Sequence, residues 1–205
     1  MSCLSKPKEQ QKVGNILLAG ATGYLGMHIL SDFLENNDGN AYCLVRGDSL
    51  SGSENRMLQL LNYYFADQYD SLLGTRIQVV CADLEKDLFG LNQEHYNMLT
   101  RNVTTVINSA ASVKHYGSYK YFYNMNVETV NRLIAFCFES GTKLIHISTL
   151  SVSGNSFADE FDGFVSKTEK HFFESDLYIG QPLDNVYARS KFEAEKKCMM
   201  LWLKG

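Results

Sequence analysis

Basic residues are not gathered anywhere along this 205-residue sequence. Its 19 lysines and arginines are spread among 23 aspartates and glutamates, which gives a formal net charge of −4. A nucleic-acid-binding domain needs a basic face that matches the phosphate backbone. The composition therefore argues against nucleic acid as a partner.

Paired cysteines and metal-binding patterns are also missing. The five cysteines include no C-x-x-C motif, and their number is odd. No two of the five histidines have the spacing of metal ligands. This usage is typical of the reducing cytosol and argues against a disulfide framework or a metal site. We interpret His146, which lies in an apolar segment, as structural, and we assign no role to Lys114 and His115.

Long apolar segments are absent as well. No run is long enough to span a bilayer, and the N-terminus lacks the apolar part of a signal peptide. We therefore expect a cytoplasmic protein that has no membrane partner. Residues 1–12 are polar and rich in lysine, which is typical of a flexible leader or linker. Residues 13–205 are enough for one domain with a sizeable core.

The residues after this leader combine a short apolar run with regularly spaced glycines. The run Ile16–Leu18 predicts a buried strand, and apolar residues at helical spacing predict a helix from Met27 to Leu34. Between them lie Gly20, Gly23 and Gly26. Such a turn lets a pyrophosphate approach the backbone and lets the helix pack closely on the strand. We interpret the segment as the first half of a dinucleotide-binding unit; a plain strand-to-helix turn is the alternative.

Strands and helices alternate along the rest of the chain. Further strands are predicted at residues 41–45, 76–81, 105–108 and 144–147. Helical spacing recurs at residues 58–65, 93–100, 127–138 and 186–203, whereas residues 153–184 show no clear period. This alternation predicts an α/β fold with a doubly wound parallel sheet (Rossmann fold) in three α/β/α layers.

Charged and small side chains follow the predicted strands, at the sheet edge where ligands of such folds bind. Arg46 follows the second strand, where it would attract the 2′-phosphate of NADP, and Arg56 is a second candidate. The alternative for Arg46 is a solvated loop arginine. Asp83, after the third strand, is placed either to accept a hydrogen bond from adenine or to cap the next turn. Small residues after Asn108 would let the cofactor ribose lie against the backbone.

The last predicted helix opens with Tyr187 and Lys191, which are four residues apart and therefore share one face. An ammonium group beside a phenol stabilises the phenolate, so the tyrosine can donate a proton to a substrate oxygen as hydride arrives. Thr149, after the fifth strand, would hydrogen-bond the same oxygen. The alternatives are a solvated tyrosine–lysine pair and a threonine that satisfies a strand end.

Together these motifs resemble the extended short-chain dehydrogenase/reductase superfamily. The resemblance rests on GATGYLG from Gly20, ADL from Ala82, NSAA from Asn108, NV from Asn126, ISTLSVSG from Ile147 and YARSK from Tyr187. Within the superfamily, the sequence is most similar to the thioester reductase domains that end nonribosomal peptide synthetases, with carboxylic acid reductases close behind. That finer similarity rests on CLVRG from Cys43, HISTLSVSG from His146 and FFESDLYIGQPLDNVYARSKFEAEK from Phe172, and it extends from Val13 to Leu203.

The resemblance implies an NADPH-dependent enzyme with Thr149, Tyr187 and Lys191 as its catalytic set. It implies reduction of an acyl or peptidyl thioester, held on the phosphopantetheine arm of a carrier protein, to an aldehyde and in some relatives to an alcohol. The cofactor-binding residues that it implies are Gly20, Thr22, Gly23, Tyr24, Leu25, Gly26, Arg46, Arg56, Asp83, Leu84, Asn108, Ala110, Tyr187 and Lys191.

Relatives of this kind continue past the last helix into a smaller C-terminal lobe that forms much of the substrate pocket, whereas this sequence ends at Gly205. We therefore expect an excised piece or a truncated gene product that binds NADPH but reduces thioesters poorly or not at all. Two other functions remain open. One is a nucleotide-sugar epimerase or dehydratase of the same fold, which would favour NAD. The other is a non-catalytic NADP-binding redox sensor, against which the intact Thr149, Tyr187 and Lys191 argue.

Overall fold

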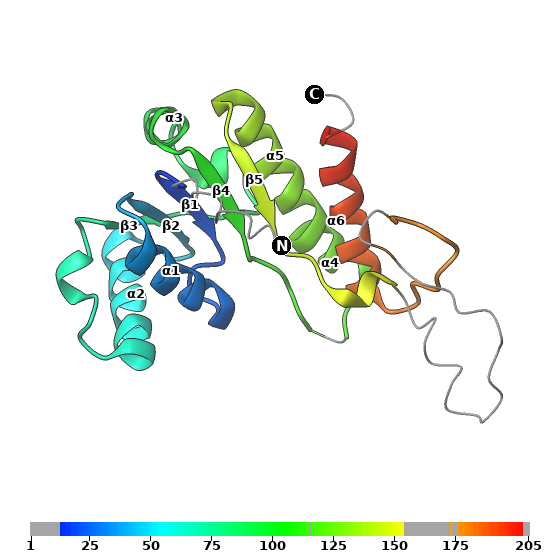
Figure 1. Cartoon of the computed structure of the whole chain (residues 1–205), viewed down its shortest axis with the longest axis horizontal. Coiled ribbons are helices and arrows are strands. Elements are labelled where there is room, and N and C mark those ends of the chain that lie inside the picture. The colour runs from blue at the N-terminus through cyan, green and yellow to red at the C-terminus, as the bar shows by residue number, and fades with distance from the viewer. Residues whose placement is uncertain (1–12, 115, 154–172, 174–175, 203–205) are drawn as a thin grey trace, which may run out of the picture.

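The computed structural model describes residues 13–114, 116–153, 173 and 176–202, and its centre is a five-stranded parallel sheet (Figure 1). The strands are β1 (Ile16–Ala19), β2 (Ala41–Val45), β3 (Ile77–Cys81), β4 (Thr105–Asn108) and β5 (Lys143–His146). Their order across the sheet is β3-β2-β1-β4-β5. The chain therefore moves outward from β1 to β3 and then returns to β4 on the other side of β1, which makes the β1–β4 boundary the switch point of the topology.

The helices of the described residues are α1 (Tyr24–Asn36), α2 (Leu50–Phe65), α3 (Gln93–Asn102), α4 (Tyr119–Phe122), α5 (Thr129–Ser140) and α6 (Val186–Trp202). A π-helical turn (Tyr123–Glu128) joins α4 to α5, and short 3₁₀ turns span Asp70–Leu72, Asp87–Gly90 and Leu150–Ser153. None of the helices described is both long and apolar enough to cross a membrane.

The two faces of β1 belong to two separate hydrophobic clusters. Ile16 and Leu18 pack with apolar residues of α1 and α2, whereas Leu17 and Ala19 pack with residues of α3 and α5. All four β1 side chains are fully buried, because a strand with helices on both faces has no solvent side. The doubly wound α/β/α fold predicted from the sequence is therefore confirmed, with α6 packed beside α5 (Figure 1).

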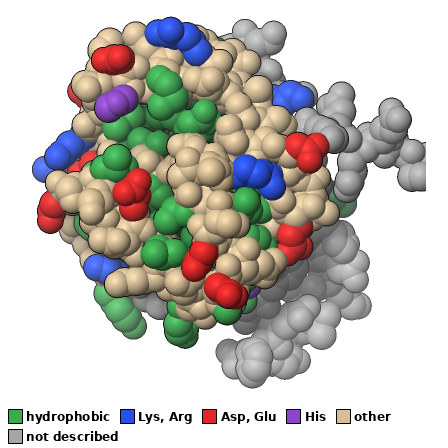
Figure 2. Space-filling model, turned by 90° about the vertical axis from the view of Figure 1, so that its left-hand side faces the viewer, with side chains coloured by type: hydrophobic (Ala, Val, Ile, Leu, Met, Phe, Trp, Pro, Cys, Tyr) green, Lys and Arg blue, Asp and Glu red, His purple; other side chains and the backbone are tan. Residues whose placement is uncertain are grey.

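Aromatic rings join α1 to α2 on one side of the molecule. The His28 ring of α1 lies edge-on to Tyr64 and Phe65 of α2, at centroid distances of 5.8 and 5.5 Å. It also contacts Tyr24 in the first turn of α1, at 4.6 Å. On this side of the molecule, apolar side chains are interspersed with side chains of both charges (Figure 2). The ring contacts fix the first turn of α1 against α2.

Several predicted element boundaries differ from the structure. The third strand begins at Ile77 rather than Arg76, whose guanidinium donates hydrogen bonds to the Leu34 carbonyl at 3.0 Å and the Gly39 carbonyl at 3.3 Å. The fifth strand lies one residue earlier than predicted, and the helix predicted at 58–65 already begins at Leu50. The first two residues of the helix predicted at 127–138 belong to the π-helical turn, which has no sequence signature, and α5 follows it from Thr129 to Ser140. The proposed leader at 1–12 and most of residues 153–184 lie outside the described residues.

Close backbone contacts explain why two positions of the turn after β1, Gly20 and Gly26, hold glycine. Gly20 has φ +85°, and a Cβ there would lie 2.6 Å from the amide nitrogen of Ala110. A Cβ on Gly26 would lie 2.1 Å from the Gly20 carbonyl oxygen. Gly23 is different, since its φ is −85° and its nearest atom would be 3.3 Å away. The packing of α1 on the sheet therefore requires Gly20 and Gly26, whereas a Cβ at Gly23 needs the Gly20 carbonyl to shift by only a few tenths of an ångström.

We predict that Gly26→Ala lowers the free energy of unfolding by about 2–3 kcal/mol, because the new methyl group cannot fit without moving α1. Gly23→Ala is the matched control and should cost less than about 1 kcal/mol. Urea denaturation followed by far-UV circular dichroism measures both. Equal stability of the two variants would contradict the close approach of α1 to the β1 turn.

Candidate active site

The predicted site residues lie at one edge of the sheet, where the carboxyl ends of the parallel strands meet. The glycine turn follows β1, Arg46 follows β2, Asp83 follows β3, Asn108 ends β4 and Thr149 lies three residues after β5. Ligands of open α/β sheets bind at this edge, beside the switch point. The fold therefore brings these residues to one side of the molecule, although they are spread over more than 100 positions of the chain.

The N-terminus of α1 is built to receive an anion. Its N-cap is Gly23, which has no side chain to accept the first backbone N–H groups, and its first turn contains no acidic residue. By contrast, Ser49 caps α2 and Asn92 caps α3 with side-chain oxygens. Uncapped N–H groups at the positive end of a helix suit a phosphate. The side chains of Tyr24 and Leu25 are exposed beside this end, and Thr22 is half-buried in the turn.

The segment after β4 lies directly against the glycine turn. The Ser109 hydroxyl donates a hydrogen bond to the Ala19 carbonyl at 2.9 Å, and the Ser109 N–H donates to the same carbonyl at 3.0 Å. The Ala110 N–H donates to Asn108 Oδ1 at 3.0 Å. Asn108 itself is fully buried, and Ala110 is half-buried. Small side chains and satisfied backbone groups therefore line the edge between β1 and β4.

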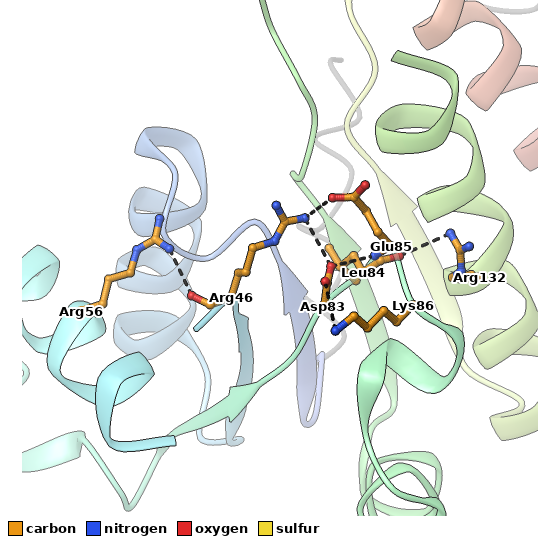
Figure 3. Close-up of polar contacts among 7 residues, drawn as sticks. All are labelled: Arg46, Arg56, Asp83, Leu84, Glu85, Lys86 and Arg132. Atoms are coloured by element: carbon orange, nitrogen blue, oxygen red, sulfur yellow. Dashed lines mark hydrogen bonds and ion pairs between the residues drawn. The ribbon is translucent and has the colours of Figure 1, made fainter. Parts of the chain in front are cut away.

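The Arg46 guanidinium forms ion pairs with two carboxylates of the segment after β3 (Figure 3). Its Nη2 lies 3.3 Å from Asp83 Oδ1 and 2.5 Å from Glu85 Oε1. Arg56 of α2 donates from Nη1 to the Arg46 carbonyl at 3.2 Å. The Arg46 side chain is 54% exposed and is paired with both acids. Its role toward a 2′-phosphate stays a prediction.

Asp83 caps the turn that follows β3, as one of its two predicted roles requires. Its Oδ1 accepts the Glu85 N–H at 3.1 Å, and its own N–H donates to the Phe89 carbonyl at 2.8 Å. The carbonyl of Leu84 accepts a 3.5 Å hydrogen bond from Arg132 of α5. Whether Asp83 also binds adenine stays a prediction.

Lys191 is buried at the carboxyl end of β5. Asn185 caps α6 by accepting the Tyr187 and Ala188 N–H groups at 2.8 and 3.2 Å, which places Tyr187 and Lys191 in the first two turns. Only 3% of Lys191 is exposed, and its Nζ donates to the Ile147 carbonyl at 2.6 Å. Burial lowers the pKa of this ammonium group to about 8, because the charged form loses its hydration.

His146 lies between Asn108 and Lys191. Asn108 Oδ1 accepts the Ala110 N–H, so its Nδ2 is oriented to donate to His146 Nδ1, at 3.1 Å. The other ring nitrogen, Nε2, lies 3.5 Å from Lys191 Nζ. Burial, and secondly the Lys191 charge, lower the pKa of His146 to about 3. The ring therefore stays neutral and lies between Asn108 of β4 and Lys191 of α6. This agrees with the interpretation of His146 as structural.

The hydroxyl groups of Thr149 and Tyr187 belong to the predicted catalytic set, and in the part of the chain that the structure describes they share no hydrogen-bond partner. Thr149 Oγ1 accepts the Ser151 N–H at 3.3 Å and donates to Ser151 Oγ at 3.4 Å. Among the described residues, no hydrogen bond links Tyr187 to Thr149 or to Lys191. Thr149 thus caps the 3₁₀ turn that begins at Leu150. The shared role of Thr149, Tyr187 and Lys191 around a substrate oxygen stays a prediction.

Asn126 is a residue whose role the sequence did not indicate. It is buried in the π-helical turn, where its Oδ1 accepts the Ser112 N–H at 2.7 Å. Its Nδ2 donates to the Ser112 carbonyl at 3.2 Å and to the Ser190 hydroxyl at 2.9 Å. One amide therefore connects the segment after β4 to α6, next to Lys191. The NV motif pointed to this position but not to these partners.

Taken together, a parallel sheet of this order, an uncapped helix after a glycine turn and a buried lysine on α6 define a nicotinamide-dinucleotide-binding domain of the extended short-chain dehydrogenase/reductase type. The chain belongs to the "Male sterility protein" family of NAD-binding domains, whose model matches residues 18–201.

Similar proteins include parts of large synthetases. The nonribosomal peptide synthetase asaC of Aspergillus flavus is 28% identical over 199 residues, which cover 94% of this chain and 18% of that protein. A thiolation-reductase di-domain from an archaeal nonribosomal peptide synthetase is 34% identical and has a TM-score of 0.79. The match covers 95% of this chain and 39% of the di-domain chain. The terminal R domain of the myxalamid pathway is 26% identical, with a TM-score of 0.80 and coverage of 95% and 47%. The chain thus spans less than half of each of these proteins.

We predict that His146 makes the protein less stable in acid. Between pH 6.5 and about 3, the unfolded chain takes up a proton on this imidazole that the folded chain does not. The free energy of unfolding therefore falls as the pH falls through this window, by at most about 1.4 kcal/mol per pH unit. His146→Gln, which keeps an acceptor for Asn108, should reduce this slope in urea denaturation between about pH 7 and about pH 5.

His95→Gln is the matched control for this experiment, because His95 is exposed on α3. That variant should keep the slope of the original protein. If His146→Gln and the original protein lose stability equally in acid, the ring is protonated in the folded state and the assignment fails.

Proposed function

We propose that this protein binds NADPH and reduces an acyl or peptidyl thioester, carried on the phosphopantetheine arm of a carrier protein, to an aldehyde. The observation that carries the proposal is the position of Lys191, buried at the same sheet edge as the uncapped N-terminus of α1. The resemblance of the motifs to thioester reductase domains adds the substrate class. The similar proteins, which are nonribosomal peptide synthetases and their reductase domains, support it.

The residues present fit a dinucleotide. The backbone of residues 20–26 would receive the pyrophosphate, since the α1 N-terminus has neither a side-chain cap nor an acid nearby. Arg46 and Arg56 would hold the 2′-phosphate, Asp83 and Leu84 would lie beside adenine, and Lys191 would hydrogen-bond the nicotinamide ribose. Ala110, whose amide nitrogen lies close to Gly20, carries only a methyl group at this edge of the sheet.

When bound, NADPH supplies a hydride for the thioester carbonyl carbon. Thr149 and Tyr187 would donate hydrogen bonds to the carbonyl oxygen, which gains negative charge as the hydride adds. Tyr187 would then give its proton to that oxygen, and Lys191 would stabilise the phenolate left behind. The resulting hemithioacetal loses its thiol: the carbon–sulfur bond breaks, the hydroxyl proton passes to sulfur, and an aldehyde leaves.

We further propose that the described part of the site mainly holds the cofactor. The described residues supply the dinucleotide side of the site. The solved relatives to which the chain is similar are more than twice as long as the part that matches it.

The first test of the proposal is the choice of dinucleotide. We predict that NADPH binds at least about tenfold more tightly than NADH, because only NADPH carries a group for Arg46 and Arg56. Titration of the cofactor's fluorescence with the protein measures both dissociation constants. A clear preference for NADH would contradict the proposal and favour an epimerase or dehydratase of the same fold.

The second test concerns the proton donor. With an acyl-thioester mimic and NADPH, and with the aldehyde trapped as it forms, Tyr187→Phe should lower aldehyde formation by about 100-fold or more. NADPH binding should stay within about twofold, since the ring remains. Tyr63→Phe, at an exposed position of α2, is the matched control and should change neither measurement. An unchanged rate in Tyr187→Phe would show that this hydroxyl takes no part.

A further inference from the structure

The two acids that pair with Arg46 come from the same short segment, but they are held very differently (Figure 3). Asp83 is fixed by the turn after β3, through hydrogen bonds to Glu85 N–H and the Phe89 carbonyl, and Lys86 Nζ lies 3.9 Å from its second oxygen. It cannot leave Arg46 without opening the turn.

The Glu85 carboxylate, in contrast, is not held by hydrogen bonds to the turn. Within the described residues, its carboxylate has Arg46 as its one partner, at 2.5 Å, and 39% of its side chain is exposed. A long, half-exposed side chain with a single partner can rotate into solvent at little cost. Glu85 is therefore the exchangeable partner of Arg46, and Asp83 is the fixed one.

A guanidinium fork binds a carboxylate and a phosphate with the same donors. The Arg46 Nη2 that Glu85 occupies is one of the donors that a 2′-phosphate could use. The two anions also repel each other, because Arg46, Arg56 and Lys86 supply three positive charges, whereas Asp83, Glu85 and a dianionic phosphate would bring four negative ones. Pairing of Glu85 with Arg46 therefore weakens binding of the phosphate.

We propose that Glu85 competes with the 2′-phosphate of NADPH for the Arg46 guanidinium and so sets how strongly this protein prefers NADPH over NADH. The inference rests on the proposed NADPH function and adds a specificity-determining residue to it. NADH has a hydroxyl in place of the phosphate and leaves the Arg46–Glu85 pair intact. Glu85 thus lowers the affinity for one dinucleotide only.

The test measures dissociation constants for NADPH and NADH with the original protein and with Glu85→Gln, at low salt. The amide keeps the size of the side chain and removes its charge. We expect NADPH to bind about threefold to tenfold more tightly to the variant and NADH to change by less than about twofold, as befits a half-exposed ion pair. The gain should shrink at high salt, where exposed charges are screened.

Two controls separate this competition from general effects of charge. Glu94→Gln removes a carboxylate from the first turn of α3, outside the Arg46 cluster, and should change neither constant. In an Arg46→Ala background, Glu85→Gln should no longer tighten NADPH, because the contested group is gone.

Unchanged or weaker NADPH binding by Glu85→Gln, an equal gain for NADH, or the same gain in the Arg46→Ala background would each overturn the inference. Failure of the proposed function is recognised separately, in the original protein: if it binds neither dinucleotide or prefers NADH, the function itself is wrong. If it prefers NADPH and Glu85→Gln has no effect, only the role of Glu85 is wrong.

Discussion

The site depends on the contact between the Gly20 carbonyl and the backbone of Gly26. With no Cβ at Gly26, the first turn of α1 rests directly on the turn after β1, and Gly20 in turn rests on the amide of Ala110. Three backbone segments thus meet without intervening side chains. This contact aims the uncapped N–H groups of α1 across the switch point of the sheet, where the fold offers a place for a phosphorylated ligand.

A second constraint is the burial of a cation beside this edge. Lys191 is almost completely buried, and its ammonium group donates to a carbonyl and lies beside an imidazole, while the Glu195 carboxylate acts on it through its charge without an ion-pair contact. Removing a charge from water in this way is costly, and the protein accepts the cost where the charge lies next to the proposed reaction. His146 fits this arrangement because its remaining nitrogen is already satisfied by Asn108.

The sequence was sufficient for features that depend on local patterns. Apolar runs and glycine spacing predicted β1, α1 and the parallel sheet, and the Tyr-x-x-x-Lys spacing predicted a shared face at the start of α6. The partners of Arg46 could not be predicted in this way, because Glu85 is 39 positions away and meets Arg46 only after β2 and β3 pair. The same holds for His146, whose environment is made by β4 and α6, and for Asn126, whose direction depends on a π-helical turn.

The bonds of Asn126 have a mechanical consequence. Because this single amide links the segment after β4 to Ser190, and Ser190 adjoins Lys191 on α6, the floor of the site and the helix that carries its cation form one rigid block. Under the proposed function, such a block would not widen to suit a bulkier acyl chain. Any adaptation to a larger ligand would then fall to the opposite side of the site.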